Sequence, residues 1–432
     1  MADTTSTSPA DPTPDPADAP GGSPIVDEQT TVPGEGRQRW LSSGVIGIGA
    51  ASFLADVGHE VPTALLPSLL TSLGTPAAVL GAIEGVADGL AGMARLVGGA
   101  VSDDPARRRA LAVGGYSSTA VLSSIIGAST AVWQVGVLRA GAWAARGLRV
   151  PARNALLADI APPEAYGRAY GFERSMDNLG AIGGPLLAIF LVGLVGVRSA
   201  IGLSVIPGLL AALAIVYAIR HTPKAERRER QRIRLAVRPI LSGSLGRLMV
   251  AIAAFEFGNV AVTLFILRAT QLLEPGRFHT SAVQLALGLY VAYNVAATLV
   301  SLPAGRIGDR SGSTRVLAAG VALFGASYVG FAVGGSTVLA LAPAFLLAGV
   351  AIGCVETSQN AAVAAVAPAA LRGSAFGVFA GIQSFGNLAA SAVAGILWTA
   401  VSPGAAFYYL AAWMVIALAA LLTVRPGYTR PG

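Results

Sequence analysis

Ionisable side chains interrupt several long apolar stretches of this chain. Asp56, His59 and Glu60 follow one another at i, i+3 and i+4 in the first stretch, so they share one face of a helix. A charge at the centre of a membrane costs about 3 kcal/mol even on lenient scales, and such residues usually mark ion or substrate pathways. The candidates for proton coupling or substrate contact are Asp56, His59, Glu60, Glu84, Asp88 and Glu256.

Asp56 and Glu60 are the two acids that we expect to carry a coupling proton. If the first stretch starts as a helix near residue 41, a rise of about 1.5 Å per residue places Asp56 roughly 20 Å and Glu60 roughly 30 Å from that end. Two acids buried one turn apart can share protons as a coupled pair. The alternative makes them structural partners of His59 or Arg95, and Glu256 then becomes a candidate carrier together with the acid at position 88.

A second group of charges offers cations and anions at similar depth. Arg146, Arg149 and Arg153 line one face of the stretch that starts near residue 132, and Glu173 and Asp177 lie in the stretch that follows. Because an unpaired charge in lipid is so unfavourable, we interpret these residues as structural or gating ion pairs. The expected inter-helix charge pairs involve Arg139, Arg146, Arg149, Arg153, Glu173, Asp177 and Glu356.

The elements that hold these residues must cross a membrane. Of the 432 residues, 54% are hydrophobic and only 12% are charged, and the mean hydropathy is +0.64, whereas a soluble domain carries about 25% charged residues. Apolar runs long enough to cross about 30 Å of hydrocarbon begin near Leu41, Ala77, Ala110, Val132, Ala169, Ala200, Leu248, Ala282, Val316, Val338, Ser374 and Ala405. We therefore expect an all-α integral membrane protein with about twelve transmembrane helices.

Several other classes of protein find no support in the sequence. Cys354 is the only cysteine, and the histidines His59, His221 and His279 lie far apart, which disfavours a disulfide framework or a metal site. No GxxxxGK[ST] loop occurs, so we expect a gradient or the substrate itself to supply energy. We expect no enzyme activity, no cofactor, no metal and no nucleic-acid partner, because the basic residues sit at helix ends.

Basic residues gather in alternate loops, as they do on the cytoplasmic side of multi-pass proteins. Arginines follow the second, fourth, eighth, tenth and twelfth stretches, whereas the loops at 72–76, 128–131, 334–337 and 402–404 carry no charge. We therefore expect both termini in the cytoplasm, at a bacterial inner membrane given the arginine-rich and alanine-rich composition. The expected parts are a disordered tail 1–38, a six-helix bundle 39–220, a basic cytoplasmic linker 221–246, a second bundle 247–425 and a tail 426–432.

The chain repeats itself after 206 residues. The paired positions include Gly99 and Gly305, Asp103 and Asp309, Arg109 and Arg315, Gly147 and Gly353, Asn154 and Asn360, Gly167 and Gly373, and Gly171 and Gly377. Two parallel halves related by an axis along the membrane normal are typical of transporters that rock around a site at the midplane. The repeat therefore favours transport over a receptor or a membrane enzyme.

Two copies of one loop carry a more specific signal: GAVSDDPARRR after the second stretch and GRIGDRSGSTR after the eighth. They resemble the loop between the second and third helices of the major facilitator superfamily. In that family the aspartate engages a neighbouring helix terminus and an arginine, and so acts as a cytoplasmic latch. Asp104 and Ala106 replace the usual Arg and Gly in the first copy, so we expect a weaker first latch. The expected latch residues are Gly99, Asp103, Arg107, Arg109, Gly305, Asp309, Arg310, Gly312 and Arg315.

The fifth stretch holds Gly171, Gly180, Gly184 and Pro185. This pattern resembles the glycine-rich segment of the proton-coupled antiporters of the same superfamily, which are usually drug exporters. The family pattern ends in a further glycine pair, where this chain has Ala-Ile. The competing interpretation is a helix that simply bends and packs closely.

The resemblance covers roughly residues 40–424 and implies the major facilitator fold, with two pseudo-symmetric six-helix bundles. We expect proton-coupled efflux of a small organic compound by alternating access, with the small-molecule substrate, protons and the lipid bilayer as partners of a monomer. One alternative is a proton-coupled importer of a small metabolite. Another, from a different class, is a transporter-like membrane sensor that moves nothing.

Overall fold

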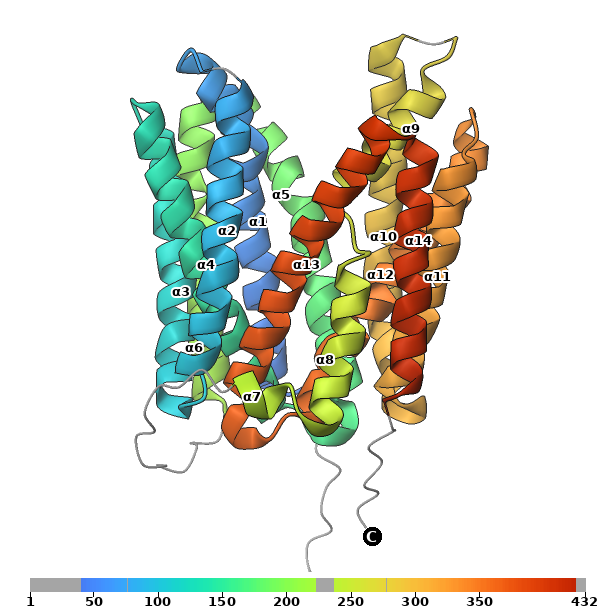
Figure 1. Cartoon of the computed structure of the whole chain (residues 1–432). Helices are drawn as coiled ribbons and strands as arrows, with labels where there is room; N and C mark the ends of the chain where they lie inside the picture. The colour runs from blue at the N-terminus through green and yellow to red at the C-terminus, as the bar shows by residue number, and fades with distance from the viewer. Residues whose placement is uncertain (1–39, 76, 223–236, 277, 425–432) are drawn as a thin grey trace, which may run out of the picture. The chain divides into compact units, whose positions relative to one another are not determined.

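A computed structural model of the chain describes residues 40–75, 77–222, 237–276 and 278–424, and all of them belong to the compact unit Arg39–Gly432. Most of the expected linker and both expected tails lie outside these described residues. Within them every regular element is a helix (Figure 1). The all-α membrane fold predicted from the sequence is confirmed.

Each half of the unit supplies six membrane-crossing segments. In the first half they are α1 (Ser43–Ser72), α2 (Ala77–Val101), α3 (Pro105–Ile125), α4 (Val132–Ile160), α5 (Tyr166–Leu203) and α6 (Val205–Arg220). The second half has α8 (Gly243–Glu256) and α9 (Thr263–Leu273) as one broken segment, then α10 (His279–Ser311), α11 (Ser313–Val333), α12 (Val338–Val366), α13 (Arg372–Ala400) and α14 (Pro403–Leu422). The short elements are η1 (Ile126–Ala128), η2 (Pro163–Ala165), α7 (Val237–Ile240) and η3 (Ala369–Leu371).

Seven helices of the described residues are long and apolar enough to cross a membrane by length and composition alone: α3, α5, α10, α11, α12, α13 and α14. The helices α1, α2 and α4 hold nine of the thirteen ionisable residues named as candidates for coupling or pairing, and charged side chains lower the mean hydropathy of a helix. The helices α6, α8 and α9 are short, at 16, 14 and 11 residues. The charged candidate residues thus distinguish the long helices α1, α2 and α4 from the seven that meet the length and composition criterion.

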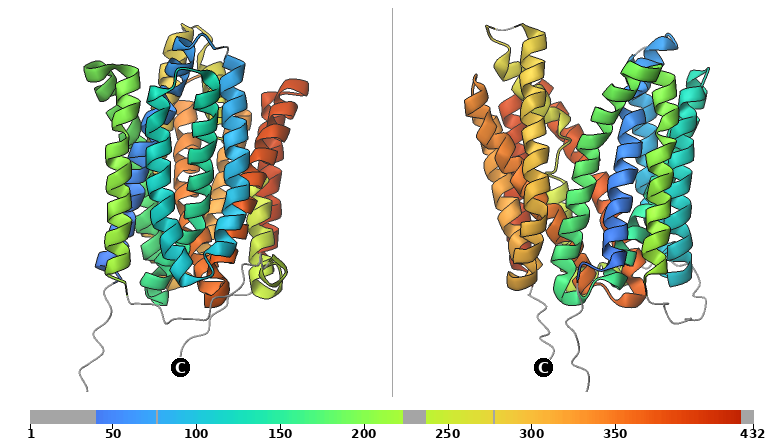
Figure 2. Two further views of the ribbon diagram at one scale, coloured as in Figure 1. Left: turned by 90° about the vertical axis from the view of Figure 1, so that its left-hand side faces the viewer. Right: turned by 180° about the vertical axis from the view of Figure 1, so that it is seen from behind.

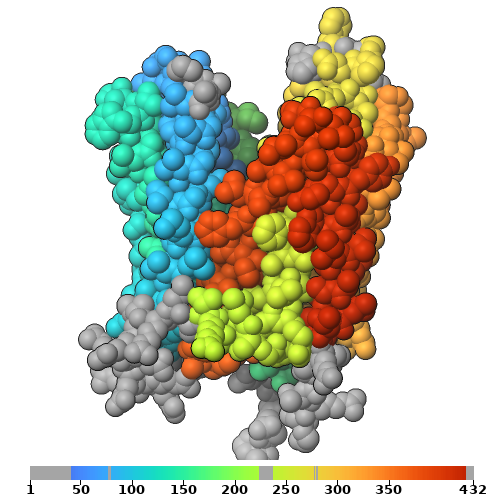
Figure 3. All heavy atoms as spheres, viewed as in Figure 1, coloured from blue at the N-terminus to red at the C-terminus, as the bar shows by residue number. Residues whose placement is uncertain are grey.

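The two halves meet at one end of the unit and separate toward the other (Figures 1 and 2). Near the meeting end α2 packs on α13 and α5 packs on α10, with Gly99 against Gly377 and Gly167 against Gly305. Toward the other end no atom lies within 4 Å of the place where a β-carbon would stand at Gly85 of α2. A space-filling view shows the resulting opening between the halves (Figure 3). We call the two ends the closed end and the open end.

Two helices depart from regular geometry. The segment 257–262 between α8 and α9 is not helical, and Tyr328 holds it by donating from its hydroxyl to the Gly258 carbonyl at 2.6 Å. In α5 the one non-helical residue is Gly196, at φ 77°, and the helix continues through Pro185. This positive φ, which glycine adopts without penalty, falls eleven residues after Pro185.

Candidate functional site

The closed end is held by two aspartates that cross between the halves. Asp309, near the end of α10, accepts hydrogen bonds from the backbone N–H groups of Gly167 at 2.6 Å and Arg168 at 3.2 Å, at the start of α5. The Arg168 Nε atom also donates to it at 2.7 Å. The unpaired N–H groups at the start of a helix and the helix dipole both favour an anion, so this aspartate stabilises the closed end.

Asp103 makes the pseudo-symmetric contact with the start of α13. It accepts hydrogen bonds from the Ser374 backbone N–H at 2.8 Å and from the Ser374 hydroxyl. Burial raises the pKa of this carboxyl above its usual value, although the bonds from Ser374 act in the opposite direction. Ser374 lies 206 residues after Arg168, so the repeat places a neutral hydroxyl where the other contact has a guanidinium.

The other residues expected in the latch lie at less central places. Asp104 caps its own helix α3, accepting from the Ala106 N–H at 2.9 Å, and it also pairs with Arg107 at 3.5 Å. Gly312 has a φ of 96°, which is the reason for glycine in the turn between α10 and α11. The remaining arginines lie on the helices that flank the two loops: Arg109 on α3, Arg310 on α10 and Arg315 on α11.

A second network at the closed end escaped the sequence analysis. The Arg108 side chain, only 2% exposed, donates to the Ser102 carbonyl at 2.7 Å and forms an ion pair with Asp159 of α4. Arg372, from the other half, reaches the same Asp159 at 3.2 Å and the Tyr166 hydroxyl at 2.8 Å. The one usable signal was the shift of 206 residues, which places Arg372 in register with Tyr166.

Glycines let the helices of the two halves approach closely at this end. A β-carbon on Gly305 would stand 2.0 Å from the Gly167 carbonyl oxygen, and one on Gly99 would stand 2.5 Å from the Gly377 Cα. Gly171 faces the Ser301 carbonyl in the same way, at 2.4 Å. Closure of this end therefore depends on residues without side chains.

Deeper in the unit the symmetry axis passes through a pair of asparagines. The Asn154 amide of α4 donates to the Asn360 amide oxygen of α12 at 3.0 Å, and these residues are 206 positions apart.

Gly180 and Gly184 of α5 pack against α1, where their β-carbons would fall 2.6 Å from the Phe53 carbonyl oxygen and 2.3 Å from Glu60 Cβ. The tight packing of α1 on α5 fixes the place of the acids on α1.

Two of the candidate acids have arginine partners on α4. Arg146 pairs with Asp56 at 3.2 Å, and Arg139 pairs with Glu84 at 2.9 Å. The sequence analysis left Asp56 without an evident cation and named Arg95 as an alternative partner. Arg95 instead donates to Ser384 of α13 in the other half. The sequence analysis missed Arg146 as the partner of Asp56, because the two side chains come together only through the packing of α4 on α1.

Asp88 and His59 have aromatic neighbours. The Trp143 indole N–H donates to Asp88 at 2.7 Å, and the Trp143 ring lies 4.2 Å from the His59 ring. The Arg139 guanidinium also contacts this tryptophan, 3.5 Å from the centre of its ring. Glu60 is 27% exposed, and the His59 Nε2 atom lies 3.9 Å from its carboxylate.

A group of five charges lies between α4, α5 and α12. Arg153 pairs with Glu173 at 2.7 Å and with Asp177 at 3.4 Å. Arg174 pairs with the same two acids at 3.2 and 3.1 Å. Arg174 also contacts Glu356 of the opposite half at 3.5 Å. One member of this group therefore links the halves, and the others join helices of the same half.

Arg149 does not have the carboxylate partner that the sequence suggested. Among the described residues no carboxylate oxygen lies within 4.0 Å of its guanidinium, which stands 4.0 Å over the Tyr116 ring. Its neighbours on α4, Arg146 and Arg153, engage the acids instead.

Glu256 is a fully buried candidate acid without a counter-charge. It is 1% exposed at the end of α8, where the broken segment begins. Its carboxylate accepts hydrogen bonds from the Asn259 amide at 2.9 Å and the Gln359 amide at 3.2 Å. Gln383 of α13 extends the set by donating to Gln359 at 3.3 Å. In the part of the chain that the structure describes, no Arg or His atom lies within 4.0 Å of its oxygens.

Comparison with known proteins agrees with this architecture. The family model for the Major Facilitator Superfamily matches residues 48–272 and 248–431. An uncharacterised MFS-type transporter of Methanocaldococcus jannaschii is 26% identical over 388 residues, covering 89% of this chain and 95% of its own. An uncharacterised protein of Mycobacterium tuberculosis is 27% identical over 393 residues, covering 87% and 91%.

Solved structures share the fold at low sequence identity. A bacterial homologue of the iron transporter ferroportin in an outward-facing state superposes with a TM-score of 0.72 at 15% identity, over 88% of this chain and 99% of that one. The human organic anion transporter MFSD10 gives a TM-score of 0.66 at 14% identity, with the same coverage of both chains. The proton:xylose symporter XylE gives 0.66 at 15% identity, over 89% and 95%. The chain therefore belongs to the major facilitator superfamily and is a multi-pass membrane transporter of that type.

Proposed function

We propose that this protein is a secondary transporter that exports a small organic compound in exchange for protons by alternating access. The observation that carries the proton coupling is the isolation of Glu256. A buried carboxylate whose hydrogen-bond partners are neutral amides has no counter-charge in contact to offset the cost of burying its own charge, so burial favours a bound proton. It can lose that proton only when a conformational change admits water or a cation.

Glu256 replaces Asp56 and Glu60 as our first choice of proton carrier. The choice of those two acids depended on an excess of acids over cations in the first two helices. Arg146 removes that excess for Asp56, because its guanidinium lies 3.2 Å from the carboxylate, whereas no arginine or histidine of the described residues lies within 4.0 Å of Glu256. We propose that the Asp56–Arg146 pair instead responds to the charge of the substrate.

We propose that the closed end faces the cytoplasm. The connections at that end and the helix starts that follow them carry arginines, with Arg108, Arg168 and Arg372 among them, and arginine-rich connections remain inside. The conformation is then outward-open, in a bacterial inner membrane with both termini in the cytoplasm. A reporter that is active only outside the cytoplasm, fused to the C-terminus, should remain silent, and activity there would reverse this topology.

The partly exposed charges favour a substrate that carries an amine or another cationic group. Glu60, Glu84 and Glu356 are 27%, 31% and 30% exposed, against 25% for Arg146. Three acids and one base leave these partly exposed residues with a negative balance. A cationic compound that approaches these acids would compete with the arginines for them, and so bind the two access states differently.

The test is transport in reconstituted vesicles. Candidate organic cations are first selected by thermal stabilisation of the purified protein, and uptake is then driven by an imposed pH gradient. Glu256→Gln should fold, because a glutamine can still bond with Asn259 and Gln359, and should retain substrate exchange while losing gradient-driven transport. Glu164→Gln, at an exposed position on η2, serves as the matched control. Full gradient-driven transport by Glu256→Gln would disprove the proton role, and transport in the opposite direction would disprove export.

A further inference from the structure

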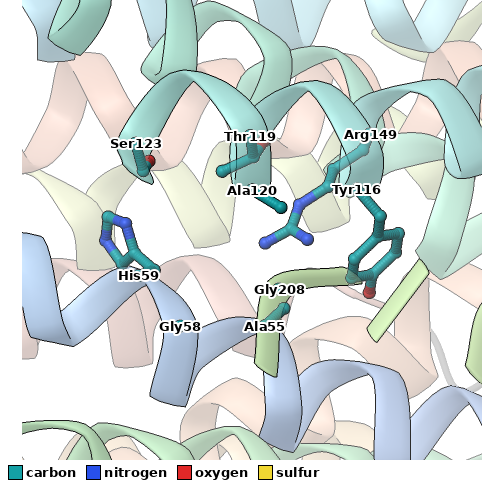
Figure 4. A pocket seen from close by; sticks show the side chains of 9 residues that line it. All are labelled: Ala55, Gly58, His59, Tyr116, Thr119, Ala120, Ser123, Arg149 and Gly208. Atoms are coloured by element: carbon teal, nitrogen blue, oxygen red, sulfur yellow. The ribbon is translucent and has the colours of Figure 1, made fainter. Parts of the chain in front are cut away.

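A small pocket lies inside the bundle of the first half, and its lining comes from that half alone. It is lined by residues of α1, α3, α4 and α6, and its polar side chains are His59, Tyr116, Thr119, Ser123 and Arg149 (Figure 4). None of these residues takes part in the contacts between the halves described above. The proposed transport mechanism does not use the pocket.

Arg149 gives the pocket a positive charge, and among the described residues no carboxylate oxygen lies within 4.0 Å of its guanidinium. The side chain is 3% exposed, and the Tyr116 ring lies against it at 4.0 Å. A cation–π contact contributes about 2 kcal/mol when desolvated, whereas a buried charge without a partner costs several times as much. The acids that could serve are held elsewhere, Asp56 by Arg146 and Glu173 by Arg153.

Three further polar atoms of the pocket lack a hydrogen-bond partner, whereas the Thr119 hydroxyl donates to the Gly115 carbonyl at 2.7 Å. The Nδ1 atom of His59 and the hydroxyls of Tyr116 and Ser123 are buried, and none has a hydrogen-bond partner among the described residues. These side chains are 4%, 1% and 2% exposed. In Figure 4 the His59 and Ser123 side chains lie on one side of the Arg149 guanidinium and Tyr116 lies on the other. The Ser123 hydroxyl, the Arg149 guanidinium and the His59 imidazole, in the tautomer that carries its proton on Nδ1, can donate to one negative ion, and the Tyr116 hydroxyl lines the same pocket from the other side.

We propose that this pocket binds a single small monovalent anion of the size of chloride. Water would satisfy the donors but would leave the guanidinium charge uncompensated. Phosphate or a carboxylic acid would need more room, since the pocket holds about one water-sized sphere. The anion joins helices of the first bundle through residues of α1, α3 and α4, and it therefore stabilises that bundle without contacting the transported substrate.

The experiment measures anion-dependent stability of the purified full-length protein. Thermal unfolding is followed while chloride replaces gluconate at constant ionic strength, and bromide is then used as the probe for an anomalous-scattering peak in crystals. We expect a saturable stabilisation by chloride and by bromide. Tyr116→Phe and Ser123→Ala each remove one donor at little change in volume, so each should weaken the apparent affinity about tenfold. Arg149→Gln should abolish the response.

Ser118→Ala is the matched control, since Ser118 is exposed on the same helix α3. It should keep the wild-type response. If Arg149→Gln fails to fold, the two hydroxyl variants still decide the outcome. Equal stabilisation by gluconate and chloride, an unchanged chloride affinity in both hydroxyl variants, or bromide density only elsewhere would each overturn the proposal.

Discussion

Loss of the negative charge of Asp309 should open the closed end more than loss of the charge of Asp103. Asp309 accepts three hydrogen bonds, at 2.6, 3.2 and 2.7 Å, two of them from the backbone at the start of α5 and one from the Arg168 side chain. Asp103 accepts two, both from Ser374. An Asp→Asn change keeps the shape of either side chain, retains one acceptor oxygen and removes the charge.

The magnitude follows from these partners. A hydrogen bond to a charged group contributes about 1.5–3 kcal/mol, and an ion pair with a partly exposed arginine contributes about 1 kcal/mol or less. Because Arg168 is 32% exposed, we assign its pair the lower value. Asp309→Asn should therefore shift the equilibrium between the two access states by about 3 kcal/mol, on the order of 100-fold. Asp103→Asn keeps two neutral hydrogen bonds and should shift it by about 1.5 kcal/mol, or roughly tenfold.

The assay is a distance measurement between spin labels on the two halves. Cysteines at the exposed positions Ala106 and Ala369 carry the labels, in a background that replaces Cys354 by Ala. The long-distance population should grow most in Asp309→Asn. Asp104→Asn is the matched control, because Asp104 caps a helix of its own half and should shift nothing. Equal shifts at positions 103 and 309, or a shift in the control, would refute the reasoning.

Two further predictions concern close packing and paired charge. Gly305→Ala places a β-carbon 2.0 Å from the Gly167 carbonyl oxygen, so the same spin labels should report loss of the closed state. Gly85→Ala, which has free space around it, is the control and should behave as wild type. An unchanged closed population in Gly305→Ala would contradict this packing. Arg153→Gln leaves Glu173, which is 1% exposed, without its closest cation, and should destabilise the protein by about 3–5 kcal/mol in thermal unfolding. The double variant with Glu173→Gln should recover most of this loss, and failure to recover it would argue against a direct pair.

The fold and the two aspartates of the closed end followed from sequence patterns, whereas the network of Arg108, Asp159 and Arg372 did not. Helix lengths come from apolar runs, and the shift of 206 residues already places Gly99 with Gly305 and Asn154 with Asn360. Asp309 was located by a motif whose chemistry is local, because an anion near a helix N-terminus needs only the right loop. Family membership and the all-α membrane fold are therefore encoded in patterns that the sequence itself displays.

The partners of the buried charges were not readable in this way. Whether Asp56 meets Arg146 or Arg95 depends on how far α4 and α2 are rotated about their own axes, and hydropathy does not fix that rotation in helices with charges on several faces. Arg108 and Arg107 are adjacent in sequence, yet only Arg108 is buried. The isolation of Glu256 depends on side chains of α12 and α13 that lie about 100 residues or more away.

The distribution of charge assigns different roles to the two halves. Paired charges of the first half, such as Arg153 with Glu173, join helices that move together, so they need not separate during transport. The contact between Arg174 and Glu356 crosses the halves and must break when the closed end opens. A carboxylate freed there at 30% exposure can accept a cationic group or a proton, whereas Glu256 can accept only what reaches the break between α8 and α9. The Arg174–Glu356 pair thus joins the two halves, whereas the Arg153–Glu173 pair joins helices of the first half.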